Sequence, residues 1–297
     1  MIRLNYMDEF IALAETLSFT AAAQRCFTTS SSLRRHIAEI EEDLGGRLFG
    51  RTPHHVSITP ADEVAYQSFK RIRNAYEQTC SEVAMLSHGA HGLIKIASPY
   101  YWTEDFTEPL VALFTGTEPS CTVQIMSCQI LDGEEALISG RADVFVDQKT
   151  DHHDPDIICK PFSTQGFSAV VLADDPLAQR ERVAFEDLAG RRFVFLDPKP
   201  NGVEDMNRQC ADLLASHGIE AGSPCFAQQI DTLGITLREC KGVSLMPYAI
   251  RRMDRSYPAF VPIEGQQDAV KMCLYYLADN SNPLLPRFLD AATTFPG

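Results

Sequence analysis

The hydrophobic pattern of this 297-residue chain changes type near residues 88–92, and no other feature constrains the fold as strongly. Before the change, apolar residues recur every three or four positions, as on amphipathic helices. After it, short apolar runs typical of strands alternate with helical stretches. A chain of this length is expected to form two or three domains, and HGAHG at 88–92 predicts a joint between them.

The clearest helical pattern before the joint predicts a helix at about residues 30–44. Their apolar residues step by four, three and four positions and fall on one stripe of a helix: Leu33, Ile37, Ile40 and Leu44. Thr29 is placed to accept an unpaired backbone N–H as the N-cap, and Gly45 follows as a residue that tolerates the left-handed conformation. At about 100° per residue, Ser31 and Arg35 lie opposite the stripe.

Charge is sorted along the axis of this predicted helix. Arg34, Arg35 and His36 come early. The acidic residues come late: Glu39, Glu41, Glu42 and Asp43. A helix lying along its whole length on DNA would press those carboxylates against phosphates. The order therefore favours a helix that enters the major groove by its N-terminal end.

Two shorter helices and a hairpin are predicted around this segment. Apolar spacing indicates a helix over residues 5–17, and Ser18 is placed to cap a second helix over 20–26. Within RLFGRTPHHVSIT (47–59), apolar and polar residues alternate as in a small hairpin. The basic residues at its tip are Arg51, His54 and His55. The hairpin is interpreted as a basic wing, with a surface hairpin that has no partner as the alternative.

A long amphipathic helix is predicted to start at Thr59-Pro60 and to span roughly 28 residues, or about 40 Å. Its apolar positions alternate spacings of three and four and form a near-heptad seam: Ala65, Phe69, Ile72, Tyr76, Thr79, Val83 and Leu86. An isolated rod has to bury this seam. A second copy of the chain is the simplest partner.

Beyond residue 92 the pattern predicts an α/β fold. Strands are expected at 93–98, 122–127, 142–147, 167–173, 192–197, 242–247 and 271–278. Helices are expected near 104–115, 131–139, 204–217, 231–240 and 284–293. This alternation indicates open, largely parallel sheets, in which ligands bind beyond the carboxyl ends of the strands.

The net charge of −14 is unevenly distributed. Residues 1–91 hold 9 Lys/Arg and 11 Asp/Glu, whereas residues 92–297 hold 17 and 29. The near-neutral N-terminal part can therefore present a local basic patch to nucleic acid. No apolar run approaches ~18 residues and the N-terminus lacks the apolar core of a signal peptide. We therefore expect no membrane partner and a cytoplasmic location.

No constellation in the sequence predicts catalysis or a bound metal. The nine cysteines include no C-x-x-C pair, so free thiols are expected, with a redox-sensing thiol as the open alternative. HHD at 152–154, near Asp151 and Asp156, lacks ligand spacing on a rigid element and is interpreted as a solvated loop. No nucleophile elbow, P-loop or catalytic acid pair is present, so we expect neither an enzyme nor a cofactor.

The segment from Phe10 to Gly50, FIALAETLSFTAAAQRCFTTSSSLRRHIAEIEEDLGGRLFG, resembles the N-terminal domain of LysR-type transcriptional regulators. SFTAAAQR, IEEDLGGRLF, and RT followed by ITPA occur in the order and at the distances of the family pattern. The rest of the chain is similar more loosely, through GLIKIAS, LISGRADVFV, DDPLA and GVSLMP. The chain departs from the pattern at Arg34, at Ser30-Ser31 and at Gly50, so the resemblance does not imply an operator sequence.

The resemblance implies a winged helix-turn-helix DNA-binding domain over 1–60 and a linker and dimerisation helix over 60–90. An α/β, two-lobed effector-binding domain like the periplasmic binding proteins would follow over 91–297. Lobe I is expected from about 92–163 with 268–297, and lobe II from about 164–267. Such proteins act as homodimers or homotetramers that bind promoter DNA and respond to a small molecule.

Candidate DNA-binding residues gather on the second and third helices and on the wing. They are Thr20, Thr29, Ser30, Ser31, Ser32, Arg34, Arg35, His36, Arg51, Thr52 and His54. Hydroxyls beside free helix N–H groups suit phosphates, and arginines suit phosphates or base edges. A solvated helix face without a partner is the alternative.

Candidate effector-binding residues follow strand ends. SPYYWTED (98–105) comes after the first strand, where the receptor-like fold places ligand contacts; a packed aromatic cluster is the alternative. The candidates are Ser98, Tyr100, Tyr101 and Trp102, and, carried over by position, Ser127, Gln129, Thr164, Gln165, Asp231 and Thr232. The aromatic richness of this stretch suggests an aromatic or phenolic effector.

Two other functions compete with a ligand-responsive DNA-binding transcription factor. A solute-binding receptor with no DNA role would share the α/β part, but the missing export signal and the basic helix end argue against it. An enzyme that uses the α/β cleft, such as a transferase, would need a catalytic constellation that the sequence lacks. The sequence therefore favours the transcription factor.

Overall fold

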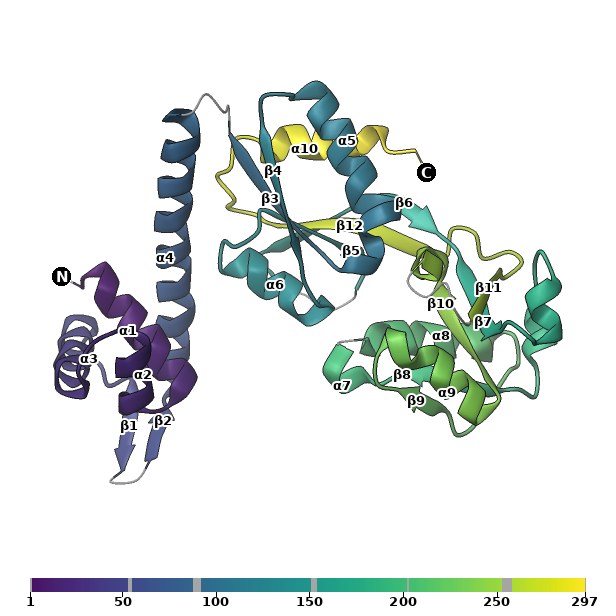
Figure 1. The fold of residues 1–297 in the computed structure, drawn as a ribbon, viewed down its shortest axis with the longest axis horizontal. Helices are drawn as coiled ribbons and strands as arrows, with labels where there is room; N and C mark the ends of the chain where they lie inside the picture. The colour runs from purple at the N-terminus through teal and green to yellow at the C-terminus, as the bar shows by residue number, and fades with distance from the viewer. Residues whose placement is uncertain are drawn as a thin grey trace. The chain divides into compact units, whose positions relative to one another are not determined.

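The computed structural model describes residues 2–52, 55–87, 92–150, 154–201, 203–252 and 258–296 of the chain. These residues form two compact units (Figure 1). The N-terminal unit is built from residues 1–89 with 138–141, and the C-terminal unit from 90–137 and 142–297. Among the described helices, none is both long and apolar enough to cross a membrane.

Three helices, a hairpin and a long helix make up the N-terminal unit, in the predicted order. They are α1 (Leu4–Thr16), α2 (Phe19–Arg25), α3 (Ser30–Leu44), β1 (Phe49–Thr52), β2 (His55–Ile58) and α4 (Pro60–Ser87). The ring of Phe10 lies 5.2 Å from that of Phe49 and 5.1 Å from that of Phe69, measured between centroids. One side chain of α1 therefore joins the hairpin and α4 in a common core.

The predicted caps are present. The Thr29 hydroxyl accepts the Ser32 N–H at the start of α3, and Gly45 ends that helix in the left-handed region at φ 70°. The Ser18 hydroxyl accepts the Ala21 N–H at the start of α2.

The apolar stripe of α3 faces the core with one exception. Leu33, Ile37 and Ile40 are completely buried. Leu44 is 48% exposed, contrary to the prediction. It is the last residue of the helix, and the chain turns away at Gly45 before the helix reaches a packing partner for it.

The near-heptad seam of α4 is divided along its length. Ala65 and Phe69 are buried in the core of the N-terminal unit. Ile72, Tyr76 and Val83 continue the same stripe and are 46%, 55% and 58% exposed. The first part of the seam therefore stabilises the unit itself, and the second part presents apolar side chains on the surface.

Lobe I of the C-terminal unit contains a five-stranded sheet. Its strands, in spatial order, are β4 (Thr122–Ser127), β3 (Leu93–Ser98), β5 (Val144–Gln148), β12 (Val270–Leu277) and β6 (Ile157–Gln165). Its helices are α5 (Glu108–Thr117), α6 (Ile130–Ile138) and α10 (Leu285–Ala291). Phe114 and Phe288 join α5 to α10. Gly133 lets α6 approach the ring of Phe145, which a Cβ at that position would meet at 2.3 Å.

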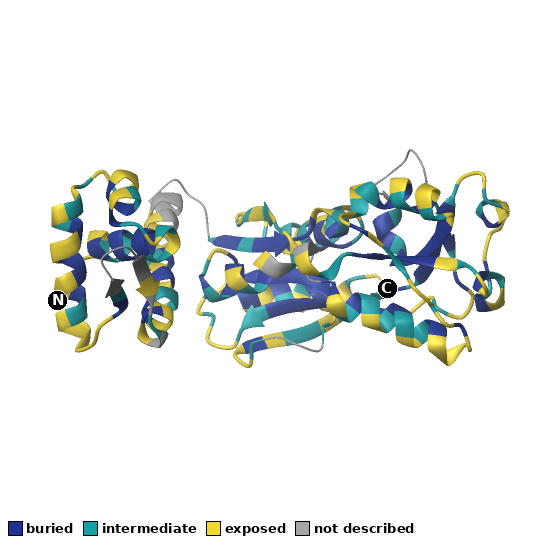
Figure 2. Cartoon of the chain, turned by 90° about the horizontal axis from the view of Figure 1, so that it is seen from below, coloured by how far each residue is buried: buried dark blue, intermediate teal, exposed yellow. Residues whose placement is uncertain are grey.

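Lobe II contains the second five-stranded sheet. Its strands, in spatial order, are β11 (Pro258–Pro262), β7 (Phe167–Leu172), β10 (Gly242–Pro247), β8 (Arg192–Leu196) and β9 (Cys225–Ala227). Its helices are α7 (Pro198–Asn201), α8 (Glu204–Ser216) and α9 (Leu233–Cys240). The central strands of both lobes are largely buried, whereas the edge strands are half-buried or exposed and the helices expose their outer faces (Figure 2).

The sheets are mixed rather than largely parallel, which corrects the prediction. In lobe I, β12 runs antiparallel to both β5 and β6, and in lobe II, β7 runs antiparallel to both β10 and β11. Three strands were not predicted: β6, β9 and β11. All three lie at sheet edges, where strands are short, polar or interrupted by proline, and so lack the buried apolar run that identifies a central strand.

The chain crosses between the lobes twice, after β6 and before β12. The Phe167 N–H donates to the carbonyl of Gln266 at 3.2 Å, which pairs the two crossing segments. A Cβ at Gly166 would lie 2.8 Å from the Gln266 carbonyl oxygen. Glycine therefore allows the two segments to approach each other closely.

The expectation that all cysteines are free is wrong for one pair. Cys225 of β9 and Cys240 at the end of α9 form a disulfide. The two residues are 15 positions apart, but α9 returns alongside the sheet and brings their Cα atoms to 6.8 Å. Sequence spacing alone did not predict this proximity. None of the other seven cysteines, all of which the structure describes, forms a disulfide.

Candidate nucleic-acid interface and ligand cleft

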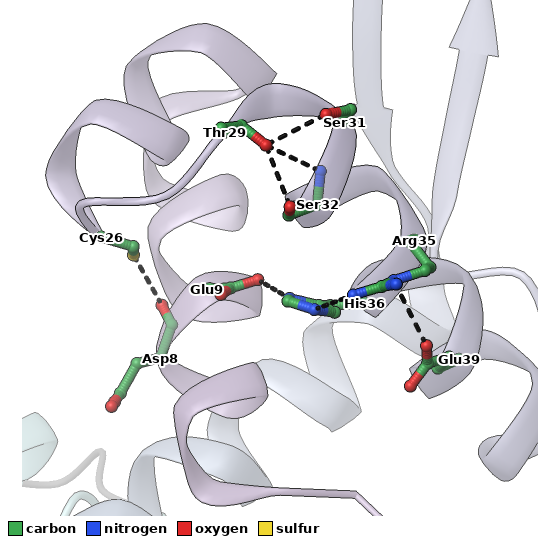
Figure 3. Close-up of polar contacts among 9 residues, drawn as sticks. All are labelled: Asp8, Glu9, Cys26, Thr29, Ser31, Ser32, Arg35, His36 and Glu39. Atoms are coloured by element: carbon green, nitrogen blue, oxygen red, sulfur yellow. Dashed lines mark hydrogen bonds and ion pairs between the residues drawn. The ribbon is translucent and has the colours of Figure 1, made fainter.

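The N-terminal end of α3 exposes hydroxyl groups beside free backbone N–H groups. The Thr29 oxygen lies 3.0 Å from the Ser31 oxygen and 2.9 Å from the Ser32 oxygen, and it accepts the Ser32 N–H at 3.2 Å (Figure 3). Thr29 and Ser31 are exposed, whereas Ser30 and Ser32 are half-buried. Such a helix end is a ready site for an anion, because its N–H groups and dipole favour negative charge.

Arg34 and Arg35 extend from the first turns of α3, and both are exposed. The Arg34 guanidinium lies 4.1 Å from the ring centroid of Phe19 on α2, so the ring orients it. The Nε of Arg35 lies 3.7 Å from a carboxylate oxygen of Glu39, one turn along the helix. Thr20 of α2 is also exposed.

His36, also predicted to bind DNA, does not belong to this exposed set. Its side chain is buried, and its Nδ1 lies 2.6 Å from a carboxylate oxygen of Glu9 on α1 (Figure 3). Its ring stacks on Tyr6 with 3.9 Å between centroids and 16° between planes. His36 therefore joins α3 to α1.

The wing is held to α3 by a contact that the sequence did not reveal. Glu41 accepts the backbone N–H groups of Leu48 and Phe49 through one carboxylate oxygen, at 3.1 and 3.3 Å. One of the late acids of α3 thus positions the start of β1. In the hairpin, Arg51 pairs with Val56 and Thr52 with His55. His54 lies outside the described residues.

A small cavity lies between the lobes, where the predicted effector site was expected. Its volume is about 40 Å³. It is lined by Tyr100, Tyr101, Gln129, Ile130, Leu196, Val203, Gln229 and Ile230. Since one water needs about 10–15 Å³ of this kind of space, the cavity has room for only a few waters. A metabolite would require the lobes to separate.

Three of the predicted effector residues line the cavity: Tyr100, Tyr101 and Gln129. Two others lie behind it. Ser98 is buried, and its hydroxyl lies 2.7 Å from that of Thr107. Trp102 is buried as well, and its indole N–H donates to Asp147 at 2.8 Å. The alternative of a packed aromatic cluster is therefore correct for Trp102.

The remaining predicted effector residues do not line the cavity. Thr164 donates to Asp268 at 2.7 Å. The Gln165 side chain is buried and accepts the Ala249 N–H at 2.9 Å, so it ties the crossing segment to lobe II. Asp231 and Thr232 lie in the 3-10 turn Ile230–Thr232, where Thr232 accepts the Gln229 N–H. Ser127 is an exposed residue at the end of β4.

The cavity residues that the sequence did not reveal are Ile130, Leu196, Val203, Gln229 and Ile230. Leu196 ends β8, and Ile230 opens the turn before α9. Strand-end position was the available signal for Leu196. Ile130 follows the end of β4, and Gln229 and Ile230 follow the end of β9, a strand that the sequence did not predict.

Asp147, at the end of β5, is a buried carboxylate close to this cavity. It accepts the Trp102 indole N–H and the Gln148 backbone N–H, at 2.8 and 2.7 Å. Burial raises its pKa to about 7, although both hydrogen bonds act to lower it. Burial also raises the pKa of the Tyr101 phenol well above its usual value, with the Asp147 carboxyl as the next cause. The cavity wall at Tyr101 therefore presents a neutral phenol.

An ion pair links the lobes beside the cleft. Arg251 of the 3-10 turn Tyr248–Arg252 lies 3.2 Å from a carboxylate oxygen of Asp105, in the π-helical turn Thr103–Thr107. Its guanidinium stacks 4.0 Å from the ring centroid of Tyr248. Opening of the cleft would have to stretch this contact.

No group of three His, Cys, Asp or Glu side chains within the described ranges is arranged to hold a metal ion. Residues 151–153, which include two of the three HHD positions, lie outside those ranges.

Both parts of the chain match family models. Residues 4–63 match the model described as bacterial regulatory helix-turn-helix protein, lysR family, and residues 87–295 match the LysR substrate binding domain. Together these matches cover both units of the structure.

Individual relatives are similar at low identity. The transcriptional regulator CysL of Bacillus subtilis is 27% identical over 64% of this chain and 63% of its own length. The regulator AlsR of the same organism is 23% identical over 97% of this chain and 94% of its own. The structure of full-length CbnR in complex with its target DNA has a TM-score of 0.74 at 20% identity, covering 98% of both chains, and shows the same fold.

Proposed function

The chain belongs to the LysR family of DNA-binding transcriptional regulators, and from this premise we propose that it binds promoter DNA through the N-terminal end of α3. We further propose that a small molecule bound between the lobes changes that binding. The observation that carries the proposal is the pairing of two surfaces in one chain. One is an exposed, hydroxyl-rich and arginine-bearing helix end, and the other is a cleft between two α/β lobes.

The exposed end of α3 supports DNA binding by its chemistry. Thr29 and Ser31 place hydroxyls beside free N–H groups, which suits phosphate oxygens. Arg34 and Arg35 project from the following turn, and an arginine fork can bind the O6 and N7 atoms of a guanine. The exposed acidic residues lie at the far end of the helix, away from a groove entered by the N-terminus.

The exposed part of the α4 seam supports assembly with a second copy. Ile72, Tyr76 and Val83 repeat at intervals of four and seven, which suits packing against the same stripe of another helix. Two copies would place two α3 helices on one DNA duplex. CbnR is a related protein that has been solved bound to its target DNA.

The lining of the cleft supports an aromatic or phenolic effector. Tyr100 and Tyr101 supply ring faces and hydroxyls, while Gln129 and Gln229 supply amides that can donate or accept. Ile130, Leu196 and Val203 add apolar surface that would flank a planar ring. A ligand of this kind would open the closed cavity and hold the lobes at a new separation.

The DNA-binding surface is tested by single substitutions on α3. Arg34→Ala and Arg35→Ala should each weaken binding to the promoter next to the protein's own gene by about 1–3 kcal/mol if the side chain reads a base. Arg287→Ala is the matched control, because Arg287 is an exposed arginine of lobe I paired with Glu118. Unchanged affinity of the Arg34→Ala/Arg35→Ala double variant in a gel-shift titration would remove α3 as the DNA-binding element.

A further inference from the structure

The disulfide between Cys225 and Cys240 closes a segment that contributes to the lobe II side of the cavity. Cys225 begins β9, and Cys240 ends α9. Gln229 and Ile230, which line the cavity together with Leu196 and Val203 of the same lobe, lie between them. The bond therefore links the two ends of the segment that carries Gln229 and Ile230.

Other contacts hold this segment unevenly. Leu233 and Leu237 anchor α9 in the core. By contrast, β9 has three residues and lies at a sheet edge, with β8 as its one strand neighbour within the described parts of the chain. Between β9 and α9, the Gln229 N–H and carbonyl bond to the Thr232 hydroxyl. The disulfide is the covalent link between this short edge strand and the helix.

We propose that Cys225 and Cys240 form a reversible disulfide site, and that its redox state controls how firmly the Gln229–Ile230 wall of the cleft is held. Both cysteines are partly exposed and so can meet a small thiol or disulfide. Cys210 and Cys273, by contrast, are buried. Any effect of the redox state on ligand binding rests on the proposed function of the cleft. The formation of the disulfide, and its effect on how firmly Gln229 and Ile230 are held, do not depend on that function.

The chemistry is thiol–disulfide exchange with a low-molecular-weight disulfide, RSSR. The thiolate of one cysteine attacks a sulfur of RSSR, forms a mixed disulfide and releases RS⁻. The second cysteine, as its thiolate, attacks the protein sulfur of the mixed disulfide and releases the second RS⁻. In sum, two protein thiols are oxidised to one disulfide, RSSR is reduced to two RSH, and two protons pass from protein to leaving groups.

A second pair of thiols provides the internal comparison. Cys159 of β6 and Cys273 of β12 lie on neighbouring strands and their thiols are in contact, but the two sulfurs are not bonded. Cys273 is completely buried, so a reagent in solution reaches this pair less readily. Exchange is therefore expected at Cys225 and Cys240 first.

The test uses the full chain equilibrated with dithiothreitol or with glutathione disulfide, followed by alkylation with N-ethylmaleimide and peptide mass mapping. Oxidised protein should lose two alkylatable thiols, mapped to Cys225–Cys240, and dithiothreitol should restore them. Hydrogen–deuterium exchange over residues 226–232 should be about tenfold faster in the reduced protein, because removing a cross-link raises the population of locally open states. Cys121→Ser, which removes a partly exposed thiol of lobe I, should preserve this difference.

In the Cys225→Ser and Cys240→Ser variants, hydrogen–deuterium exchange over residues 226–232 should have the rate of the reduced wild-type protein in both buffers. If either variant misfolds, the comparison of oxidised and reduced wild-type protein still shows whether the disulfide changes hydrogen–deuterium exchange over residues 226–232. The proposal is overturned if all nine thiols stay alkylatable in glutathione disulfide, or if the bond maps to Cys159–Cys273. It is also overturned if hydrogen–deuterium exchange over residues 226–232 has the same rate in oxidised and reduced protein. None of these readouts involves DNA or an effector, so a failure here is distinct from a failure of the proposed regulator function.

Discussion

Arg35 and His36 are neighbours in the sequence but lie in opposite environments on α3. Arg35 is exposed, whereas His36 stacks on Tyr6 and contacts Glu9. At about 100° per residue, His36 lies roughly 60–70° from the centre of the apolar stripe, on its flank, while Arg35 lies on the far side. The angular position therefore contained the signal that His36 is an interior residue. His36 was nevertheless predicted to bind DNA, because it is basic and follows two arginines in the sequence.

The packing role of His36 is tested by an alanine substitution. His36→Ala should lower the free energy of unfolding of the N-terminal unit by about 1–3 kcal/mol, because it leaves the buried Glu9 carboxylate without its partner. Ser31→Ala, which changes an exposed residue of the same helix, should alter the free energy of unfolding by less than about 0.5 kcal/mol. Thermal unfolding followed by circular dichroism measures both. Equal stability of the two variants would contradict the packing role of His36.

Asp147 provides a pH-dependent prediction at the same scale. Its folded-state pKa of about 7 lies above the usual 3.8 of an aspartate, so ionisation of the folded protein is disfavoured. The contribution of Asp147 to stability is complete below about pH 4 and is lost as the pH rises through 7. Asp147→Asn removes the charge, and its side-chain oxygen can still accept the Trp102 N–H.

Asp147→Asn should therefore be more stable than the wild type at pH 8, by on the order of 2–4 kcal/mol, and this gain should disappear toward pH 4. Asp279→Asn, which changes an exposed carboxyl of lobe I, is the matched control. Chemical denaturation at a series of pH values measures the difference. A gain that does not depend on pH would show that Asp147 does not titrate in this range.

At the scale of elements, local chemistry predicted the helices and the hairpin of the N-terminal unit well. Thr29 and Ser18 cap where capping side chains were expected, and Gly45 ends α3. The seven runs that the sequence predicted as strands all form strands. The strands that were not predicted, β6, β9 and β11, lie at sheet edges and gain their stability from a neighbouring strand rather than from their own apolar pattern.

The seam of α4 is the element with the clearest consequence for assembly. Ile72→Glu and Tyr76→Glu place a charge on the exposed part of the seam, and each should weaken association of two copies by about 2 kcal/mol or more. Arg71→Glu, on a different face of the same helix, is the control. Light scattering during size-exclusion chromatography measures the assembly. An unchanged oligomer in both seam variants would place the interface elsewhere.

At the scale of the whole molecule, the sequence predicted the domains and the lobes better than it predicted which residues line the cavity between the lobes. Tyr101 and Gln129 follow the neighbouring parallel strands β3 and β4 of lobe I, and Leu196 and Gln229 come from the ends of the neighbouring parallel strands β8 and β9 of lobe II. Strand-end position therefore predicts which residues meet within a lobe, whereas the meeting of the two pairs depends on how the lobes face each other. Ser98 and Trp102, which have the expected position along the chain, lie behind the wall instead. The disulfide between Cys225 and Cys240 has the same origin, since it depends on how α9 returns along its sheet.

We expect this chain to bind DNA sequence-specifically through the α3 helices of two copies. Footprinting of the purified protein on the DNA beside its own gene measures this binding. Two protected half-sites are expected, with centres separated by about 10 base pairs or a multiple of that spacing, and both protections should be lost in the Arg34→Ala/Arg35→Ala variant. Absence of protection, or protection that spreads without half-sites and survives in that variant, would contradict this expectation.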